Sequence, residues 1–280
     1  MFDQLVSVDS MSRVSEVFAA AVNAGRMTFM PFITAGDPSV EATAEVLKSL
    51  RDAQVDLIEL GFPYSDPIAD GPVIQASYTR ALNAGVSVEK IFAMMDGLTG
   101  ENLPPVLAMV SYAIIFRYGT DAFAERARRA GFSGLIVPDL PVDEADDFAA
   151  TAAKHELDLV LLIAPTTTAE RTRRILKSST GFIYCVSVAG TTGVRNELPQ
   201  ELTDQLRSLR SMTSLPLAVG FGISRPEQVK TLEGVADGII VGSAIVRLAC
   251  ESKDAASAAT AVRSFSESMR AAVNAARPSL

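Results

Sequence analysis

The chain repeats one pattern along its length: a short, almost entirely apolar run, then a longer stretch in which apolar residues recur every three or four positions. Short apolar runs predict strands buried on both faces, and the longer periodicity predicts amphipathic helices. Eight strand-like runs occur, at residues 28–35, 55–61, 106–112, 134–139, 159–164, 182–187, 216–220 and 238–241. We therefore expect a parallel sheet whose strands alternate with helices.

Helices are expected between these strands, and one extra helix precedes the first strand. Apolar residues at i, i+3 and i+4 spacing predict this N-terminal helix over 12–24. Asp37 is expected to cap the next helix, with Pro38 in its first turn and an end near Ala53. The other predicted helices span 73–83, 88–98, 121–130, 143–156, 199–212, 244–250 and 254–276, and two more begin at Thr168 and at a capping box over 224–227.

Eight strands in alternation with helices predict a closed (β/α)8 barrel, the TIM barrel fold, with the extra N-terminal helix added. The length of 280 residues fits one such barrel, and no composition shift marks a linker. We therefore expect a single domain over 1–280, in which 1–11 form a loose leader. Ligands of this fold bind in the loops that follow the strands, so the functional residues are sought there.

Composition narrows the function classes. The net charge is -8 and no Lys/Arg-rich run occurs, which argues against a nucleic-acid or membrane partner. No apolar run approaches the roughly 20 residues of a membrane span, and a cytoplasmic protein is expected. Cys185 and Cys250 lack metal-binding spacing, and His155 is the only histidine. We expect no metal and no cofactor.

One predicted strand carries an acid where its pattern calls for an apolar residue. Strict alternation would place Val55, Leu57 and Glu59 on one face. A buried carboxyl without partners raises its pKa and holds its proton, as general acid/base catalysis near neutral pH requires. Asp70 follows in a proline- and glycine-rich loop and is expected to supply a second carboxylate in a wetter environment. The alternative is that Glu59 pairs with a buried Arg or Lys, although its neighbours supply no obvious cation.

Glycines and hydroxyls follow the last three strands. The segments 220–224 and 242–243 bring backbone amides to the N-termini of two helices, the usual phosphate site of this fold. The segment 190–193 adds a third such loop, which could close as a lid. The alternatives are tight-turn glycines in the first two segments and a plain flexible loop in the third. A phosphorylated small-molecule substrate is therefore predicted.

Five segments resemble the tryptophan synthase alpha chain family: 31–38 (PFITAGDP), 58–75 (IELGFPYSDPIADGPVIQ), 137–142 (VPDLPV), 220–224 (GFGIS) and 241–246 (VGSAIV). The resemblance covers residues 12–270. It implies a (β/α)8 lyase of tryptophan biosynthesis that cleaves indole-3-glycerol phosphate to indole and glyceraldehyde 3-phosphate. It also implies an α2β2 heterotetramer, in which the beta chain consumes the indole through a tunnel.

The resemblance also assigns roles to individual residues. It makes Glu59 and Asp70 the catalytic acids, and we hypothesise that Glu59 makes the proton transfers while Asp70 accepts a hydrogen bond from the indole N–H. Asp66 falls where the loop after the second strand meets the beta chain in this family. An equal alternative is that Asp66 is a solvated loop acid or a helix cap. The implied substrate-binding residues are Phe32, Tyr184, Thr192, Gly193, Phe221, Gly222, Gly242 and Ser243.

The chain departs from the family pattern at three positions. Ser111 and Ala113 replace a tyrosine and an asparagine that many members carry after the third strand, and Val188 replaces a basic residue before the mobile loop. The first two departures keep open a catalytically weak subunit that mainly binds and activates a beta-type partner. Another phosphosugar-binding barrel isomerase is a further alternative, although the single histidine argues against the metal-dependent epimerases of this architecture.

Overall fold

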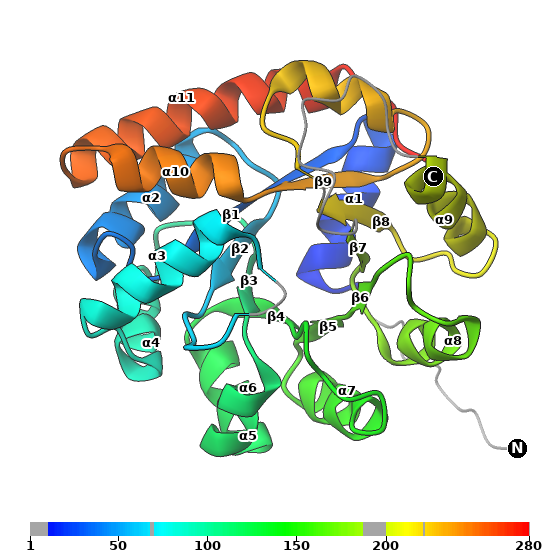
Figure 1. The fold of residues 1–280 in the computed structure, drawn as a ribbon, viewed down its shortest axis with the longest axis horizontal. Helices are drawn as coiled ribbons and strands as arrows, with labels where there is room; N and C mark the ends of the chain where they lie inside the picture. The colour runs from blue at the N-terminus through cyan, green and yellow to red at the C-terminus, as the bar shows by residue number, and fades with distance from the viewer. Residues whose placement is uncertain (1–10, 68–69, 187–199, 221, 280) are drawn as a thin grey trace, which may run out of the picture.

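A computed structural model describes residues 11–67, 70–186, 200–220 and 222–279 of the chain. Its strands pair in parallel in one sheet, in the order β5-β4-β3-β2-β1-β9-β8-β7-β6. The two edge segments, β5 and β6, are separated only by Leu161, so they are two parts of one extended strand and the sheet closes into a barrel (Figure 1). The strands are β1 Thr28–Thr34, β2 Ile58–Gly61, β3 Val106–Met109, β4 Phe132–Ile136, β5 Asp158–Val160, β6 Leu162–Ile163, β7 Ile183–Val186, β8 Leu217–Gly220 and β9 Gly238–Val241.

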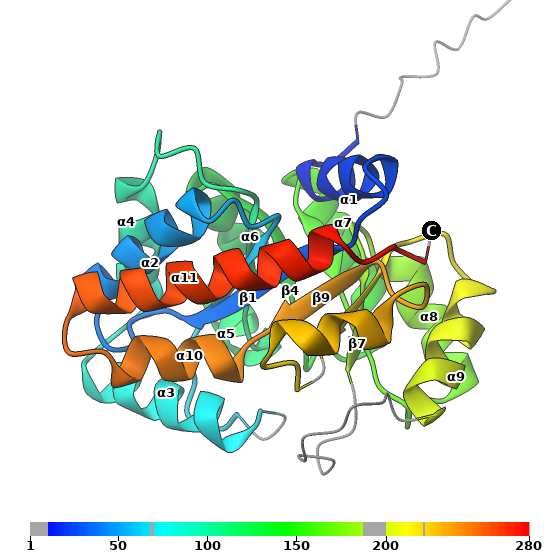
Figure 2. The same ribbon diagram turned by 90° about the horizontal axis from the view of Figure 1, so that it is seen from above.

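The helices pack on the outer side of this barrel, except the N-terminal one, which lies across one end (Figures 1 and 2), and this arrangement confirms the predicted α/β barrel. They are α1 Arg13–Asn23, α2 Val40–Asp52, α3 Pro72–Asn83, α4 Val88–Gly97, α5 Tyr112–Tyr118, α6 Thr120–Arg129, α7 Ala145–Lys154, α8 Ala169–Ser178, α9 Gln200–Arg210, the 3-10 helix η1 Pro226–Leu232, α10 Ser243–Glu251 and α11 Ala255–Asn274. Over the described ranges, none of the helices is long and apolar enough to cross a membrane.

The apolar residues form two main layers because side chains alternate across each strand. Ile58 and Leu60 belong to the outer layer, between the strands and the helices. Leu57 belongs to the inner layer that fills the barrel. Glu59 lies two positions beyond Leu57, so the strand carries it into the barrel at the end where the site was sought.

The predicted N-terminal helix is confirmed as α1, which begins after its N-cap Ser12. Its Val14 and Phe18 are buried in the inner layer, and the ring of Phe18 lies 5.4 Å from that of Phe182. Figure 2 shows α1 across one end of the barrel. This is the end at which the strands begin, so the opposite end remains available for a ligand.

Two predicted strands are corrected by the structure. The strand over 106–112 ends at Met109, and Tyr112 instead begins α5, whose N-cap Ser111 accepts a hydrogen bond from the backbone N–H of Ala113. A capping serine thus ends the extended run although the residues after it have strand-like composition. The strand predicted over 159–164 is interrupted at Leu161.

Two predicted helix caps are also wrong. Ser39, rather than Asp37, caps α2, because its side chain accepts from the N–H of Ala42. The carboxylate of Asp37 is instead paired with Arg80 of α3, a contact between segments far apart in the sequence. In the predicted 224–227 box, the capping side chain is Gln228, whose Oε1 accepts from the backbone N–H groups of the residues at 224 and 225.

Candidate active site

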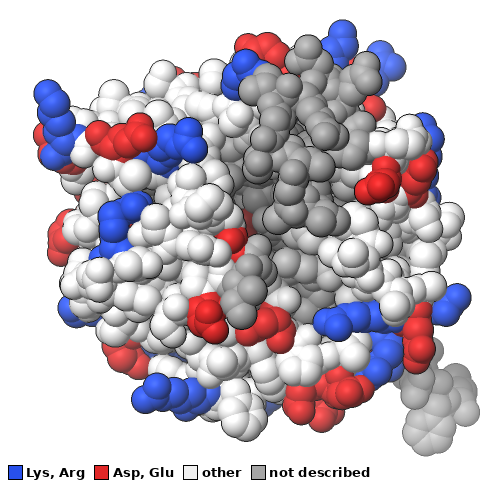
Figure 3. All heavy atoms as spheres, viewed as in Figure 1, with Lys and Arg blue, Asp and Glu red and all other residues white. Residues whose placement is uncertain are grey.

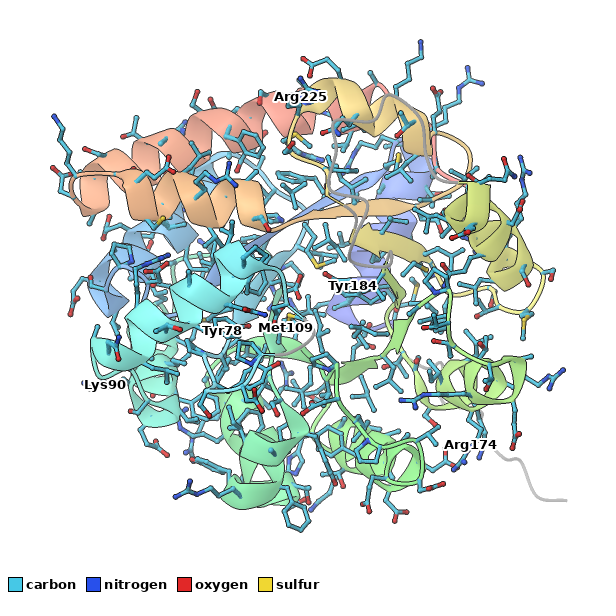
Figure 4. The ribbon with its side chains drawn as sticks, viewed as in Figure 1. Tyr78, Lys90, Met109, Arg174, Tyr184 and Arg225 are labelled. Carbon is cyan, nitrogen blue, oxygen red and sulfur yellow. The ribbon has the colours of Figure 1, made fainter. Side chains whose placement is uncertain are left out.

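A cavity of about 330 Å³ opens at the carboxyl ends of the strands. Six of the predicted site residues line it: Phe32, Asp70, Tyr184, Gly222, Gly242 and Ser243. Figure 4 shows Tyr184 with Met109 at the centre of this face, over the barrel opening. The structure therefore brings together residues that lie far apart in the sequence. Thr192, Gly193 and Phe221 lie outside the described residues, as does Val188.

Glu59 is fully buried in the barrel wall beside this cavity. It is in register with Phe32 of β1 and Leu107 of β3. Among the described residues, neither of its carboxyl oxygens has a hydrogen-bond partner. The described structure therefore does not show the alternative, in which Glu59 pairs with a buried Arg or Lys. Burial raises the pKa of Glu59 to about 8, and the nearby Asp70 contributes to the rise. Glu59 therefore carries a proton at neutral pH.

Asp70 is half-buried and lines the cavity directly. It stands two residues before Pro72, the first residue of α3, and the side-chain amide of Gln75 donates to its backbone carbonyl at 2.8 Å. Burial raises the pKa of Asp70 to about 6. At neutral pH this carboxyl is ionised while that of Glu59 is not, which divides the roles of the two acids.

Two aromatic side chains, those of Phe32 and Tyr184, line the cavity where it meets the strands. Tyr184 on β7 is buried, and burial together with Glu59 raises its pKa well above 10, so its phenol stays neutral. A side chain at Gly220 would lie only 2.5 Å from the Tyr184 ring, and one at Gly61 would lie 2.5 Å from the Phe32 ring. Glycine at these two positions leaves the space that the two rings occupy at the strand ends.

Another part of the lining, next to these rings, is built from glycines and hydroxyls. Gly242 is the N-cap residue of α10, and Ser243 is the first residue of that helix. Gly222 has a positive φ of 29° in the loop after β8, and Ser224 lies beside it in the lining. Free amides at a helix N-terminus favour an anion, and no Lys or Arg of the described residues lines the cavity. A phosphate bound here would be held by neutral donors.

Gly220, Ile223 and Ser224 of the lining belong to the predicted phosphate segment 220–224, whereas the other remaining lining residues were not predicted. They are mostly apolar side chains at the ends of the strands, among them Met109, Leu162, Val186 and Ile240. Each of these stands at an inward-facing position, so the alternation that placed Glu59 inside could have found them. They provide a hydrophobic wall suited to an aromatic substrate.

The other residues singled out in the sequence lie either near the opening of the cavity or far from it. Asp66 is exposed in the loop between β2 and α3. Figure 3 shows acidic side chains beside the opening on this face. His155 lies far from the cavity, at the end of α7, where it contacts Asp121 at 2.9 Å. In the described ranges, no three His, Cys, Asp or Glu side chains gather as a metal site.

Comparison with known proteins identifies the relatives of this chain. The family model described as "Tryptophan synthase alpha chain" matches residues 18–274. A tryptophan synthase alpha chain from Picosynechococcus sp. is 46% identical over 264 residues, which cover 94% of this chain and 100% of the relative. One from Rhodopirellula baltica is 44% identical over 279 residues, covering 95% and 100%.

Solved structures give the same result. The tryptophan synthase subunit alpha of Legionella pneumophila superposes with a TM-score of 0.86 at 35% identity, covering 95% of this chain and 100% of that one. A chain of Mycobacterium tuberculosis tryptophan synthase gives a TM-score of 0.86 at 32% identity, covering 95% and 99%.

Proposed function

The chain belongs to the tryptophan synthase alpha chain family, and from this premise we propose that Glu59 and Asp70 carry out its chemistry at the barrel mouth. As a member of the family, it is a carbon–carbon lyase of tryptophan biosynthesis. It cleaves indole-3-glycerol phosphate to indole and glyceraldehyde 3-phosphate. The cleavage needs a proton added at indole C3, a proton removed from the side-chain hydroxyl, and stabilisation of the positive charge that develops on the ring.

Glu59 makes both proton transfers in this proposal. Its carboxyl is protonated at neutral pH, so it can donate to C3. As the carbon–carbon bond breaks, its electron pair returns to the indole ring and the side-chain hydroxyl becomes the aldehyde. The hydroxyl proton passes to the carboxylate of Glu59, which restores the acid. The observation that carries the proposal is this buried acid without a hydrogen-bond partner among the described residues.

Asp70 acts by charge. It is ionised at neutral pH and lines the cavity. Its carboxylate accepts a hydrogen bond from the indole N–H and stabilises the cation that forms when C3 is protonated. Two acids with different pKa values in one site thus serve as proton donor and fixed negative charge.

The rest of the cavity binds the substrate. The amides at Gly222 and Gly242 and the hydroxyl of Ser243 hold the phosphate, while Phe32 and Tyr184 contact the indole. The family resemblance adds Thr192, Gly193 and Phe221 to the substrate-binding set. The apolar lining excludes water from the reacting atoms.

Membership of the family implies a beta-chain partner. We propose an α2β2 heterotetramer in the cytoplasm, with Asp66 at the contact between the two kinds of chain. Phe116 on α5 supports a contact surface on this side of the barrel, because 70% of this large apolar side chain is exposed. α5 follows β3 directly, so the proposed surface adjoins the cavity mouth.

The experiment is to measure indole release from indole-3-glycerol phosphate by the chain alone and by the chain with a tryptophan synthase beta chain. We expect release in both cases, and faster release in the complex. Absence of release in both would overturn the assignment of Glu59 and Asp70. Release only in the complex would support the alternative of a subunit that acts mainly through its partner.

A further inference from the structure

Tyr78 on α3 is buried beside both proposed acids, although it does not line the cavity. Its side chain is 1% exposed and belongs to an apolar cluster with Phe32, Ile74 and Val246. Its ring packs against that of Tyr64 with centroids 5.5 Å apart. Figure 4 shows Tyr78 near Met109 at the barrel opening. A tyrosine in this place brings a polar hydroxyl into an otherwise apolar cluster.

The hydroxyl of Tyr78 lies over the inward face of β2. A Cβ added at Gly61 would lie 2.9 Å from Tyr78 Oη, so the oxygen stands directly against that residue. Gly61 and Glu59 are two positions apart on one strand and share a face, roughly 6.6 Å from one another. The extended side chain of a glutamate can cover most of this distance. Tyr78 Oη is therefore within reach of the carboxyl group of Glu59.

Polar contacts fix α3, and with it Tyr78, on the neighbouring strand. The residue before it, Ser77, is hydrogen-bonded to Thr34 of β1 at 2.7 Å, and both hydroxyls are buried. Two residues after it, Arg80 makes two bonds to the buried carboxylate of Asp37, at 2.9 and 2.7 Å. These contacts hold the position of the Tyr78 ring, because they anchor the same helical turn to the barrel.

The groups that face Tyr78 are acids and phenols. They are Glu59 from β2, Tyr64 and Asp70 from the loop before α3, and Tyr184 from β7. Burial, with Asp70 and Glu59, raises the pKa of Tyr78 well above 10. The phenol therefore remains a neutral hydrogen-bond donor at every pH at which either acid titrates.

Glu59 needs such a donor during the reaction. Once it has given its proton to the substrate, it becomes an ionised carboxylate, and in the structure as described neither of its oxygens yet accepts a hydrogen bond. A buried charge without partners is costly, and a neutral donor nearby lowers that cost. We propose that Tyr78 is a positioning residue for proton transfer, whose hydroxyl donates a hydrogen bond to the carboxylate of Glu59 while that group is ionised. The inference rests on the proposed role of Glu59.

The test compares Tyr78→Phe with Tyr118→Phe, each in the chain with its beta partner. Tyr118 on α5 also packs in an aromatic cluster, with Phe92 and Phe123, but its hydroxyl faces Glu89 and neither proposed acid, so it controls for the loss of a hydroxyl. Without its donor, ionised Glu59 is less stable and its pKa rises further. We expect Tyr78→Phe to lower kcat about 10-fold with KM nearly unchanged, and to move the alkaline limb of kcat up by about one pH unit. An alkaline limb at the wild-type position would overturn the proposal.

A second measurement needs no activity. The free energy of unfolding of Tyr78→Phe relative to wild type should fall as the pH rises through about 8, and this pH dependence should vanish when both proteins also carry Glu59→Gln. A difference that is constant with pH, or that persists with Glu59→Gln, would contradict the hydrogen bond. If wild type releases no indole, the proposed function fails while this comparison still decides whether Tyr78 and Glu59 interact.

Discussion

Asp56 and Glu59 are three residues apart and both are buried, yet they lie toward opposite ends of the barrel in opposite electrostatic surroundings. Asp56, before β2, accepts bonds from Arg26 at 3.1 and 2.9 Å, from Arg270 at 2.7 Å and from the backbone N–H of Phe29 at 2.9 Å. Glu59 has no hydrogen-bond partner among the described residues. Burial alone therefore does not determine the state of an acid; its partners do.

The contrast between Asp56 and Glu59 indicates that one end of the barrel serves stability and the other serves function. At the end where the strands begin, Asp237 repeats the pattern of Asp56, because it pairs with Arg210 and accepts from the backbone N–H of Leu217. Such networks hold a charge in place. At the other end, Glu59 lacks such partners within the described part of the chain and has a pKa of about 8, suited to proton transfer. Active residues at the carboxyl ends of the strands are the rule for this fold.

The largest effect is expected from Glu59→Gln, which removes the acid and keeps its size. We expect the rate of indole release to fall on the order of 10² to 10⁴-fold, because the amide cannot donate and recover a proton. The fold and binding to the beta chain should be retained. Steady-state kinetics of the complex measure the effect, and Glu45→Gln, an exposed glutamate on α2 paired with Lys48, is the matched control. Near-wild-type turnover of Glu59→Gln would remove this residue from the mechanism.

The next largest effect is expected at the other end of the barrel, from Asp56→Asn. This change leaves the guanidinium groups of Arg26 and Arg270 without their shared carboxylate. We expect the free energy of unfolding to fall by about 3 kcal/mol, as is typical when one partner of a buried ion pair is removed. Urea unfolding measures it. Asp52→Asn, in an exposed pair with Arg51, should cost less than about 1 kcal/mol. Equal losses of the free energy of unfolding in Asp56→Asn and Asp52→Asn would contradict the claim that the buried network of Asp56 is a main source of stability.

A third prediction concerns the pH dependence of stability. The pKa of Glu59 is about 8 in the folded chain, against an ordinary value of 4.5 for a solvated glutamate, so the folded state binds the extra proton between these values. Its contribution to stability is complete below about pH 4.5 and is lost as the pH rises through about 8. Wild type should lose up to about 1.4 kcal/mol per pH unit relative to Glu59→Gln in this interval. Parallel stability curves for the two proteins would show that Glu59 does not titrate there.

Local patterns were enough to predict most of the fold. The near-continuous apolar runs located all eight strands, because strands buried on both faces tolerate few polar residues. The errors arose where a distant contact or a single cap decided the outcome. Asp37 looks like a helix cap in sequence, but its partner Arg80 is 43 residues away. The segment that begins at Tyr112 has strand-like composition and is helical because Ser111 caps it.

The site could be predicted in part for the same reason. The inward position of Glu59 follows from alternation along its strand. That no described residue bonds to its carboxyl is a property of the surrounding elements, which no local pattern contains. Tyr78 was not singled out either, since a tyrosine on the buried face of a helix is an ordinary core residue until the fold places it beside Glu59.

The smallest effect is expected from Ser111→Ala, which tests a third way of holding an acid. Asp139, near the mouth, is held by neutral donors: the hydroxyl of Ser111 at 2.6 Å and the backbone N–H of Tyr112 at 2.7 Å. The same serine caps α5, so the change removes a cap and one hydrogen bond, and we expect unfolding to become easier by about 1 to 2 kcal/mol. The control is Ser268→Ala, an exposed serine of α11 whose hydroxyl, among the described residues, bonds to the carbonyl of Phe265 in its own helix, and this change should be nearly neutral. A loss as large as that of Asp56→Asn would mean that neutral donors stabilise a carboxylate as strongly as two arginines. No loss would mean that Asp139 is held by the backbone alone, and Ser111 would then be a tolerated departure from the family pattern rather than a support of the mouth.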